Sequence, residues 1–230
     1  QYGFYGAFSL YSEKRKSEGF VNHIQNDLSS EHQWNMGRNE NAAIRENNVV
    51  VKEKEYLTFA IRDKAKTFID NNKNKPFFLW LSFNAPHVPF QAPQAYYDQF
   101  SHITDKNKRV YLAMIKALDD AVGDFMKHLK NEGLLENTIV YFISDNGGAS
   151  YTGATDNGPL KGGKITHFEG GVNVPFMMQW KGKIDKNTVF NQPVSAMDAG
   201  GDRGRRNRRS RARRHRGDAR IVHDHQRGAG

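Results

Sequence analysis

Two apolar runs that stop abruptly on polar loops constrain the fold of this chain most strongly. FFLWLSF (77–83) leads into Asn-Ala-Pro-His, and TIVYFI (138–143) leads into Ser-Asp-Asn-Gly-Gly. Continuous apolar and aromatic runs of this length predict strands buried on both faces of a sheet. VPFMMQW (174–180) is a candidate for a third strand.

Two amphipathic helical patterns lie between these runs. Apolar residues recur on one helical face from about Tyr56 to Asn71 and from about Asp105 to Asn131, and Gly133 is the expected stop of the longer helix. Strands separated by helices predict an α/β domain in which helices cover both faces of a mainly parallel or mixed sheet. In such sheets ligands gather beyond the carboxyl ends of strands, where both polar loops lie.

Two other segments predict irregular structure. Residues 21–50 are polar with weak periodicity, which predicts loops. NAPHVPFQAP (84–93) carries three prolines, which predict a fixed loop rather than a helix.

The positive charge of the chain is concentrated in its tail. Residues 201–230 hold 11 Arg, no Lys and 3 Asp, whereas the preceding 200 residues are nearly neutral. Such a tail is suited to salt-sensitive contacts with a polyanion, although a tail without a specific partner is the simpler interpretation. We therefore expect a domain at 1–198 and an Arg-rich tail at 199–230, which is disordered or a frameshift or assembly artefact.

Four side chains in the polar loops are candidates for chemistry. Asp145 and Asn146 offer hard oxygen atoms suited to Ca²⁺ or Mg²⁺, although Asp-Asn-Gly is also a common turn and Ca²⁺ takes about six oxygen ligands. His87 could donate a hydrogen bond to an anion or act as a general acid, or it could brace its loop. Lys164 could reach an oxyanion from a glycine-rich loop, or it could simply be solvated.

Three segments, taken in order, resemble the sulfatase family of the alkaline-phosphatase-like superfamily. They are PFFLWLSFNAPHVPFQAP, RVYLAMIKALDDAVGDFMKHLKNEGLLENTIVYFISDNGG and GPLKGGKITHFEGGVNVPFMMQWKGKI. The similarity runs from about Tyr56 to Asp198. It implies the alkaline-phosphatase-like fold and the hydrolysis of aryl or carbohydrate sulfate esters by a metal-bound formylglycine hydrate that attacks sulfur.

The resemblance also implies a role for each of the four candidates. Asp145 and Asn146 match the later pair of calcium ligands in the family, with Mg²⁺ as an alternative ion. His87 matches the histidine that contacts the sulfate or the leaving-group oxygen, and Lys164 matches a lysine that contacts the sulfate. Both are therefore expected to be catalytic and substrate-binding, because cationic donors and a metal stabilise charge on the transferring group.

The nucleophile motif of the family, [CS]-x-P-x-R, has no counterpart in this sequence. The chain has no cysteine, and none of its seven prolines follows a serine by two positions. The early Asp-Asp pair that completes the metal shell in the family is also missing. We therefore expect a chain without the N-terminal part of its domain, where formylglycine would lie, and catalytically incomplete on its own.

Alternative functions stay open at this point. The same metal-plus-cation arrangement serves phosphate and phosphonate monoester hydrolysis, and divergence could have left a non-catalytic relative. No specific nucleic-acid partner is expected. No run approaches the ~18 apolar residues of a membrane span. Family members are often periplasmic, secreted or lysosomal, but the first residues carry no signal-peptide pattern, so the compartment is not assigned.

Overall fold

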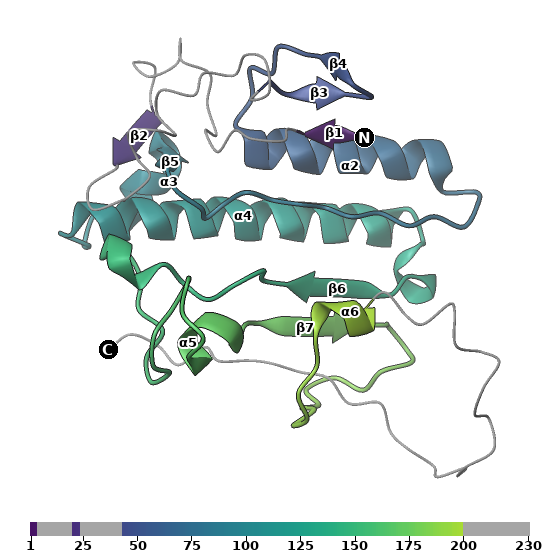
Figure 1. The fold of residues 1–230 in the computed structure, drawn as a ribbon. Helices are drawn as coiled ribbons and strands as arrows, with labels where there is room; N and C mark the ends of the chain where they lie inside the picture. The colour runs from purple at the N-terminus through teal and green to yellow at the C-terminus, as the bar shows by residue number, and fades with distance from the viewer. Residues whose placement is uncertain (4–19, 24–42, 200–230) are drawn as a thin grey trace.

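Two long helices organise the part of the chain that the structure describes (Figure 1). The computed structural model describes residues 1–3, 20–23 and 43–199; the predicted Arg-rich tail after residue 199 lies outside them. The helices are α2 (Leu57–Asn72), α3 (Gln94–Tyr97), α4 (Lys106–Asn131), α5 (Glu169–Val172) and α6 (Ala196–Ala199), with 3-10 turns η3 (Asp98–Phe100), η4 (Leu135–Asn137) and η5 (Ser150–Thr152). The strands are β1 (Tyr2–Gly3), β2 (Phe20–His23), β3 (Arg45–Glu46), β4 (Val49–Val50), β5 (Phe90–Pro93), β6 (Val140–Ile143) and β7 (Phe176–Gln179).

The two predicted helices are confirmed as α2 and α4, and α4 has the end signals that its sequence suggests. The Asp105 carboxylate accepts a hydrogen bond of 2.8 Å from the backbone N–H of Lys108, which caps the first turn. Gly133 adopts a positive φ of 70° just past the last turn, and the N–H of Leu134 donates to the carbonyl of Leu129 at 2.9 Å. These bonds use backbone groups that a helix end leaves unpaired.

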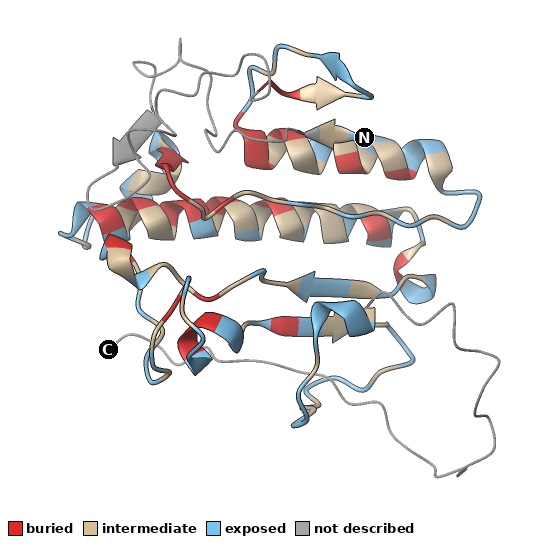
Figure 2. Cartoon of the chain, in the orientation of Figure 1, coloured by how far each residue is buried: buried red, intermediate tan, exposed pale blue. Residues whose placement is uncertain are grey.

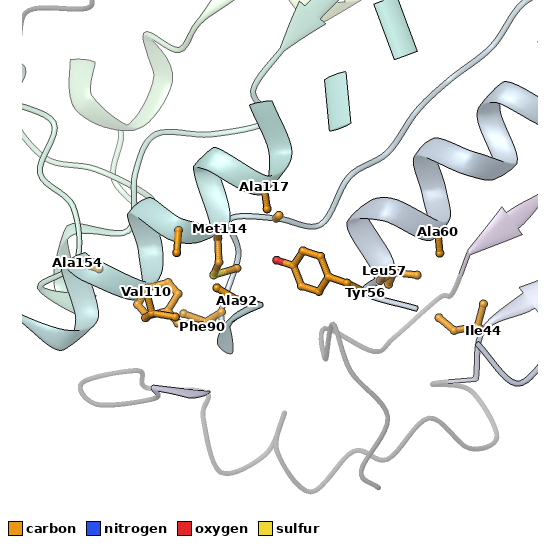
Figure 3. Packing of buried hydrophobic residues seen from close by; sticks show 13 residues of the cluster. Ile44, Tyr56, Leu57, Ala60, Phe90, Ala92, Val110, Met114, Ala117 and Ala154 are labelled. Carbon is orange, nitrogen blue, oxygen red and sulfur yellow. The ribbon is translucent and has the colours of Figure 1, made fainter. Parts of the chain in front are cut away.

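The main hydrophobic core packs α4 against the start of α2 and against β5 (Figure 3). Val110, Met114 and Phe90 are almost fully buried in it. Tyr56, the residue before α2, reaches across this core and donates its hydroxyl hydrogen to the Gln91 carbonyl at 3.0 Å. The core therefore anchors β5, and with it the loop that immediately precedes β5.

All four strand pairings in the described part of the chain are antiparallel, whereas the sequence predicts a mainly parallel or mixed sheet. β3 lies between β1 and β4, β2 pairs with β5, and β6 pairs with β7. Strands β2 to β4 occupy part of the segment predicted to be loops, and β5 ends the proline-rich segment as a strand. The β6–β7 register places Ile143 opposite Phe176, so the residues after β6 emerge beside those before β7.

The predicted burial of the two apolar runs on both faces is wrong. Residues 77–83 are extended but form no strand ladder with any described residue. Phe77 and Leu79 pack on a small second core, whereas Phe78 and Trp80 are 76% and 71% exposed. β6 likewise contains no buried residue (Figure 2). Burial alternates along residues 77–83, which are therefore covered on one face only, whereas in β6 the adjacent residues Tyr141 and Phe142 are both exposed.

Described residues include no helix with both the length and the apolar character needed to cross a membrane.

Candidate active site

His87 and Lys164 meet although 77 residues separate them in the sequence: Lys164 Nζ lies 2.6 Å from His87 Nε2. On the other side of the ring, His87 Nδ1 lies 2.7 Å from the carbonyl oxygen of Val88. A carbonyl oxygen can only accept, so Nδ1 carries the ring proton and Nε2 offers its lone pair to the lysine ammonium. The contact is therefore a directed hydrogen bond from Lys164 to a neutral imidazole.

The loop that carries His87 is held by the main core. The N–H of His87 donates to the Asn84 carbonyl at 2.8 Å, which closes a turn. Val88 and Pro89 are buried directly after it, and β5 follows. The imidazole is half-buried. The buried residues that follow it hold its loop in place, as the prolines of this segment predict.

The loop that carries Lys164 packs backbone to backbone against the loop after β6. The N–H of Lys164 donates to the Gly148 carbonyl at 3.0 Å, and the N–H of Gly147 donates to the Gly171 carbonyl at 3.0 Å. A Cβ atom at Gly147 would lie 1.7 Å from the carbonyl oxygen of Gly170. The glycines are therefore needed for the close approach of the two loops.

Asn157 joins these loops, and the sequence interpretation missed it. Its side-chain oxygen accepts from the N–H of Gly148 at 2.8 Å, and its amide nitrogen lies 3.0 Å from the Gly148 carbonyl and 3.1 Å from the Gly162 carbonyl. Asn157 lies in an Asp-Asn-Gly sequence (156–158), a common turn sequence that also occurs at 145–147. Its recurrence between two glycine-rich loops was the available signal.

Asp145 and Asn146 lie directly after β6, in the loop that bonds to Lys164. Asp145 Oδ1 accepts from the N–H of Asn146 at 2.9 Å, and Asn146 Nδ2 donates to the Gly147 carbonyl at 2.9 Å. Asp145 Oδ2 and Asn146 Oδ1 accept no hydrogen bond from any residue in the described ranges. Two uncommitted hard oxygens fit a divalent cation such as Ca²⁺ or Mg²⁺ in donor chemistry, and supply two of its ligands.

All four predicted residues thus lie on loops joined by hydrogen bonds. Lys164 makes both links: its backbone bonds to the loop of Asp145 and Asn146, and its ammonium bonds to His87. Glu169 is the first residue of α5 and accepts from the Asn173 side chain at 3.1 Å.

A second group with metal-binding side chains lies at the far end of α4, among the described residues. Ligand atoms of Asp70, His128 and Glu132 lie within 4.8 Å of one another. His128 Nε2 is 2.8 Å from Asp70 Oδ1, and Lys73 Nζ is 2.6 Å from Glu132 Oε2. Each carboxylate already has a nitrogen partner from the end of the other helix. The group is therefore explained by side-chain pairs that join the ends of α2 and α4.

Comparison with known proteins places this chain in a family. The model of the family described as Sulfatase matches residues 1–200. The uncharacterized sulfatase YdeN of Escherichia coli is 35% identical over 152 residues, which is 64% of this chain and 27% of that protein. Arylsulfatase J of Mus musculus is 35% identical over 128 residues, which is 56% of this chain and 21% of that protein.

A solved structure supports the same assignment. Ps i-CgsB, crystallised with k-i-k-neocarrahexaose, matches with a TM-score of 0.72 at 33% identity, over 86% of this chain and 43% of that chain. The chain spans about a quarter of the length of the curated relatives named above and less than half of this solved one. The α/β fold of the alkaline-phosphatase-like type is confirmed by this structural neighbour. The chain belongs to the sulfatase family.

Proposed function

We propose that the joined loops are part of the active site of a sulfuric ester hydrolase. The observation that carries this proposal is the 2.6 Å contact between Lys164 Nζ and His87 Nε2 in a chain of the sulfatase family. An ammonium has three N–H donors, and His87 takes one of them. The other donors of Lys164 are suited to the oxygens of a sulfate group, where a charge-assisted hydrogen bond is strong.

His87 is proposed to protonate the oxygen that leaves with the organic group. Its Nδ1 proton is committed to the Val88 carbonyl, so the transferable proton must sit on Nε2. A ring that carries this second proton cannot accept from Lys164, whose ammonium is then available to the sulfate. Transfer of the Nε2 proton to the leaving oxygen returns the ring to the neutral form seen here.

Asp145 and Asn146 are proposed to hold a divalent cation, with Ca²⁺ as the first choice and Mg²⁺ as the alternative. Their two uncommitted oxygens support this role, and about four further ligands must come from other groups. A bound cation of this kind stabilises negative charge on sulfate oxygens. The resemblance adds a formylglycine nucleophile, for which residues 1–230 contain no [CS]-x-P-x-R motif.

An ester of an aryl or carbohydrate alcohol is the proposed substrate. The names of two relatives, Arylsulfatase J and N-acetylgalactosamine-6-sulfatase of Mus musculus, support this range. The family match ends at residue 200, which supports a domain boundary near Asp198 with the Arg-rich segment as a separate part.

The test begins with the coding DNA upstream of codon 1, which should encode [CS]-x-P-x-R in the same frame. Protein expressed from that whole frame should hydrolyse an aryl sulfate faster than the matching aryl phosphate. Lys164→Ala should lower turnover about 100-fold or more, because it removes a charged donor from the transferring group. Lys186→Ala, at an exposed lysine outside these loops, is the matched control and should leave turnover unchanged.

Faster phosphate hydrolysis would assign the phosphate monoester alternative instead. An intact frame without the motif, together with no hydrolysis of either ester, would show a non-catalytic relative and contradict the proposal.

A further inference from the structure

Ile165, the residue after Lys164, has a backbone conformation that its side chain disfavours. Its φ is +68°, and it is the third residue of a turn in which the N–H of Thr166 donates to the Gly163 carbonyl at 3.0 Å. A turn with positive φ at this position strongly prefers glycine or asparagine. A β-branched side chain there is a genuine outlier.

The surrounding bonds impose this conformation on Ile165. The Thr166 hydroxyl donates to the Gly163 carbonyl at 2.7 Å and accepts from the Gly163 N–H at 3.1 Å. The N–H of Lys164, which directly follows Gly163, donates to the Gly148 carbonyl. Residues held in disfavoured conformations by their surroundings cluster at functional sites.

The side chain of Ile165 is in water, and so are two neighbours. Ile165 is 78% exposed, Phe168 is 50% exposed and Val172 is 61% exposed, all within eight residues after Lys164. The Lys161 ammonium lies 4.2 Å from the centre of the Phe168 ring, which supports that ring from one side. We call Ile165, Phe168 and Val172 the apolar ledge.

We propose that Ile165 determines specificity by contacting the organic group of the ester whose sulfate Lys164 binds. This inference rests on the proposed function. Ile165 directly follows Lys164, so an organic group that extends from a sulfate on the Lys164 ammonium towards Ile165 would cover an exposed apolar side chain. The matching chemistry is a flat apolar ring face, which an aryl ring or one side of a sugar ring provides.

The proposal explains why this turn has isoleucine rather than glycine, although isoleucine strains the backbone. Glycine would satisfy the backbone, but it would remove the apolar contact. Contact with the organic group would offset the cost of the disfavoured φ, because the described residues leave this side chain exposed.

The experiment uses the full 230-residue chain and two variants that suit a positive φ, Ile165→Gly and Ile165→Asn. Binding is followed by the amide chemical shifts of Lys164 and Thr166, so that anions on the Arg-rich tail do not contribute. The probes are inorganic sulfate, phenyl sulfate and the 6-sulfate of a methyl glycoside. Val49→Asn, at an exposed apolar residue of β4, is the control.

The wild-type chain should bind at least one of the two esters about tenfold more tightly than inorganic sulfate. Both Ile165 variants should lose that preference and keep their affinity for inorganic sulfate. Their thermal midpoints should be equal to or about 2–4 °C above that of the wild type, because the backbone strain is relieved. The ester with the larger dependence on Ile165 identifies the ring as aryl or carbohydrate.

The possible results separate this inference from the proposed function. A preference for the ester that persists in both variants, or equal binding of ester and inorganic sulfate by the wild type, overturns the inference alone. Binding of inorganic sulfate that Lys164→Ala does not weaken overturns the proposed function, and with it the inference that rests on it. A wild-type chain that binds none of the probes contradicts both.

Discussion

The side-chain amide of Asn157 brackets Gly148, with its oxygen 2.8 Å from the backbone nitrogen and its nitrogen 3.0 Å from the carbonyl oxygen. The same amide nitrogen is 3.1 Å from the Gly162 carbonyl. One side chain thus joins the loop after β6 to the loop of Lys164 by hydrogen bonds to their backbones, as a short strand ladder would. The position of the Lys164 backbone depends on this bracket.

Asn157→Ala should lower the free energy of unfolding by about 1–3 kcal/mol, because it leaves part-buried backbone groups without partners. Asn157→Asp should be intermediate, since it keeps the acceptor for Gly148 and loses the donors. Urea unfolding of the three proteins measures the difference. An alanine variant as stable as the wild type would show that water replaces the bracket.

Calcium should raise the thermal midpoint of the chain through Asp145. Binding to the folded state alone stabilises it by mass action, by about 2.7 kcal/mol at a hundredfold excess over the dissociation constant. Asp145→Ala should abolish the shift, and Asp70→Ala, in the group at the far end of α4, should preserve it. If Asp70→Ala abolished the shift and Asp145→Ala did not, the ion would belong to the other group.

Stability should fall at alkaline pH because of Tyr56. Burial raises the pKa of its hydroxyl far above the ordinary value of 10.0, so the folded state resists ionisation that the unfolded chain permits. Tyr56 contributes fully to the free energy of unfolding below pH 10. This contribution is lost as the pH rises from there towards the pKa of Tyr56 in the folded state. Burial also raises the pKa of Tyr111, which adds to the same trend.

Tyr56→Phe is the matched test of this pH dependence. At pH 7 it should cost about 1 kcal/mol, through the lost hydrogen bond to Gln91. Between pH 10 and 11.5 its free energy of unfolding should decline less steeply than that of the wild type. Parallel curves for the two proteins would mean that Tyr56 does not contribute to the alkaline loss.

Phe78 and Trp80 should promote association of the isolated chain. They are 76% and 71% exposed on an extended segment that pairs with no described strand, and such edges invite aggregation. Phe78→Lys combined with Trp80→Lys should raise solubility and change the free energy of unfolding by less than about 1 kcal/mol. Phe77→Lys with Leu79→Lys, on the packed face, should unfold the chain. Light scattering and urea unfolding distinguish the two pairs, and a monodisperse wild type would contradict the prediction.

The helices were predictable because their signals are local. The apolar stripe of α4, the Asp105 cap and Gly133 lie within one stretch of chain. The one-sided burial of residues 77–83 was not predictable in the same way, since it depends on what covers each face. Hydrophobicity alone does not distinguish a run covered on one face from a run covered on two.

The members of the candidate site stay a prediction, and the sequence did not indicate how their loops meet. Family resemblance selected His87 and Lys164, yet no spacing rule brings together residues 77 positions apart. Asn157 was missed because its turn sequence has a simpler explanation, and its three bonds form only when two glycine loops meet. The conformation of Ile165 had no sequence signal, since isoleucine is the wrong residue for it.

The crossing of Gly147 and Gly170 leaves no room for even one methyl group. In a library of variants selected for a folded chain, position 147 should therefore return glycine alone. Gly123 in α4, with open space around it, should accept most residues, and alanine should be enriched there. Close packing of main-chain atoms thus limits mutation at the loops, whereas helix propensity limits it on α4.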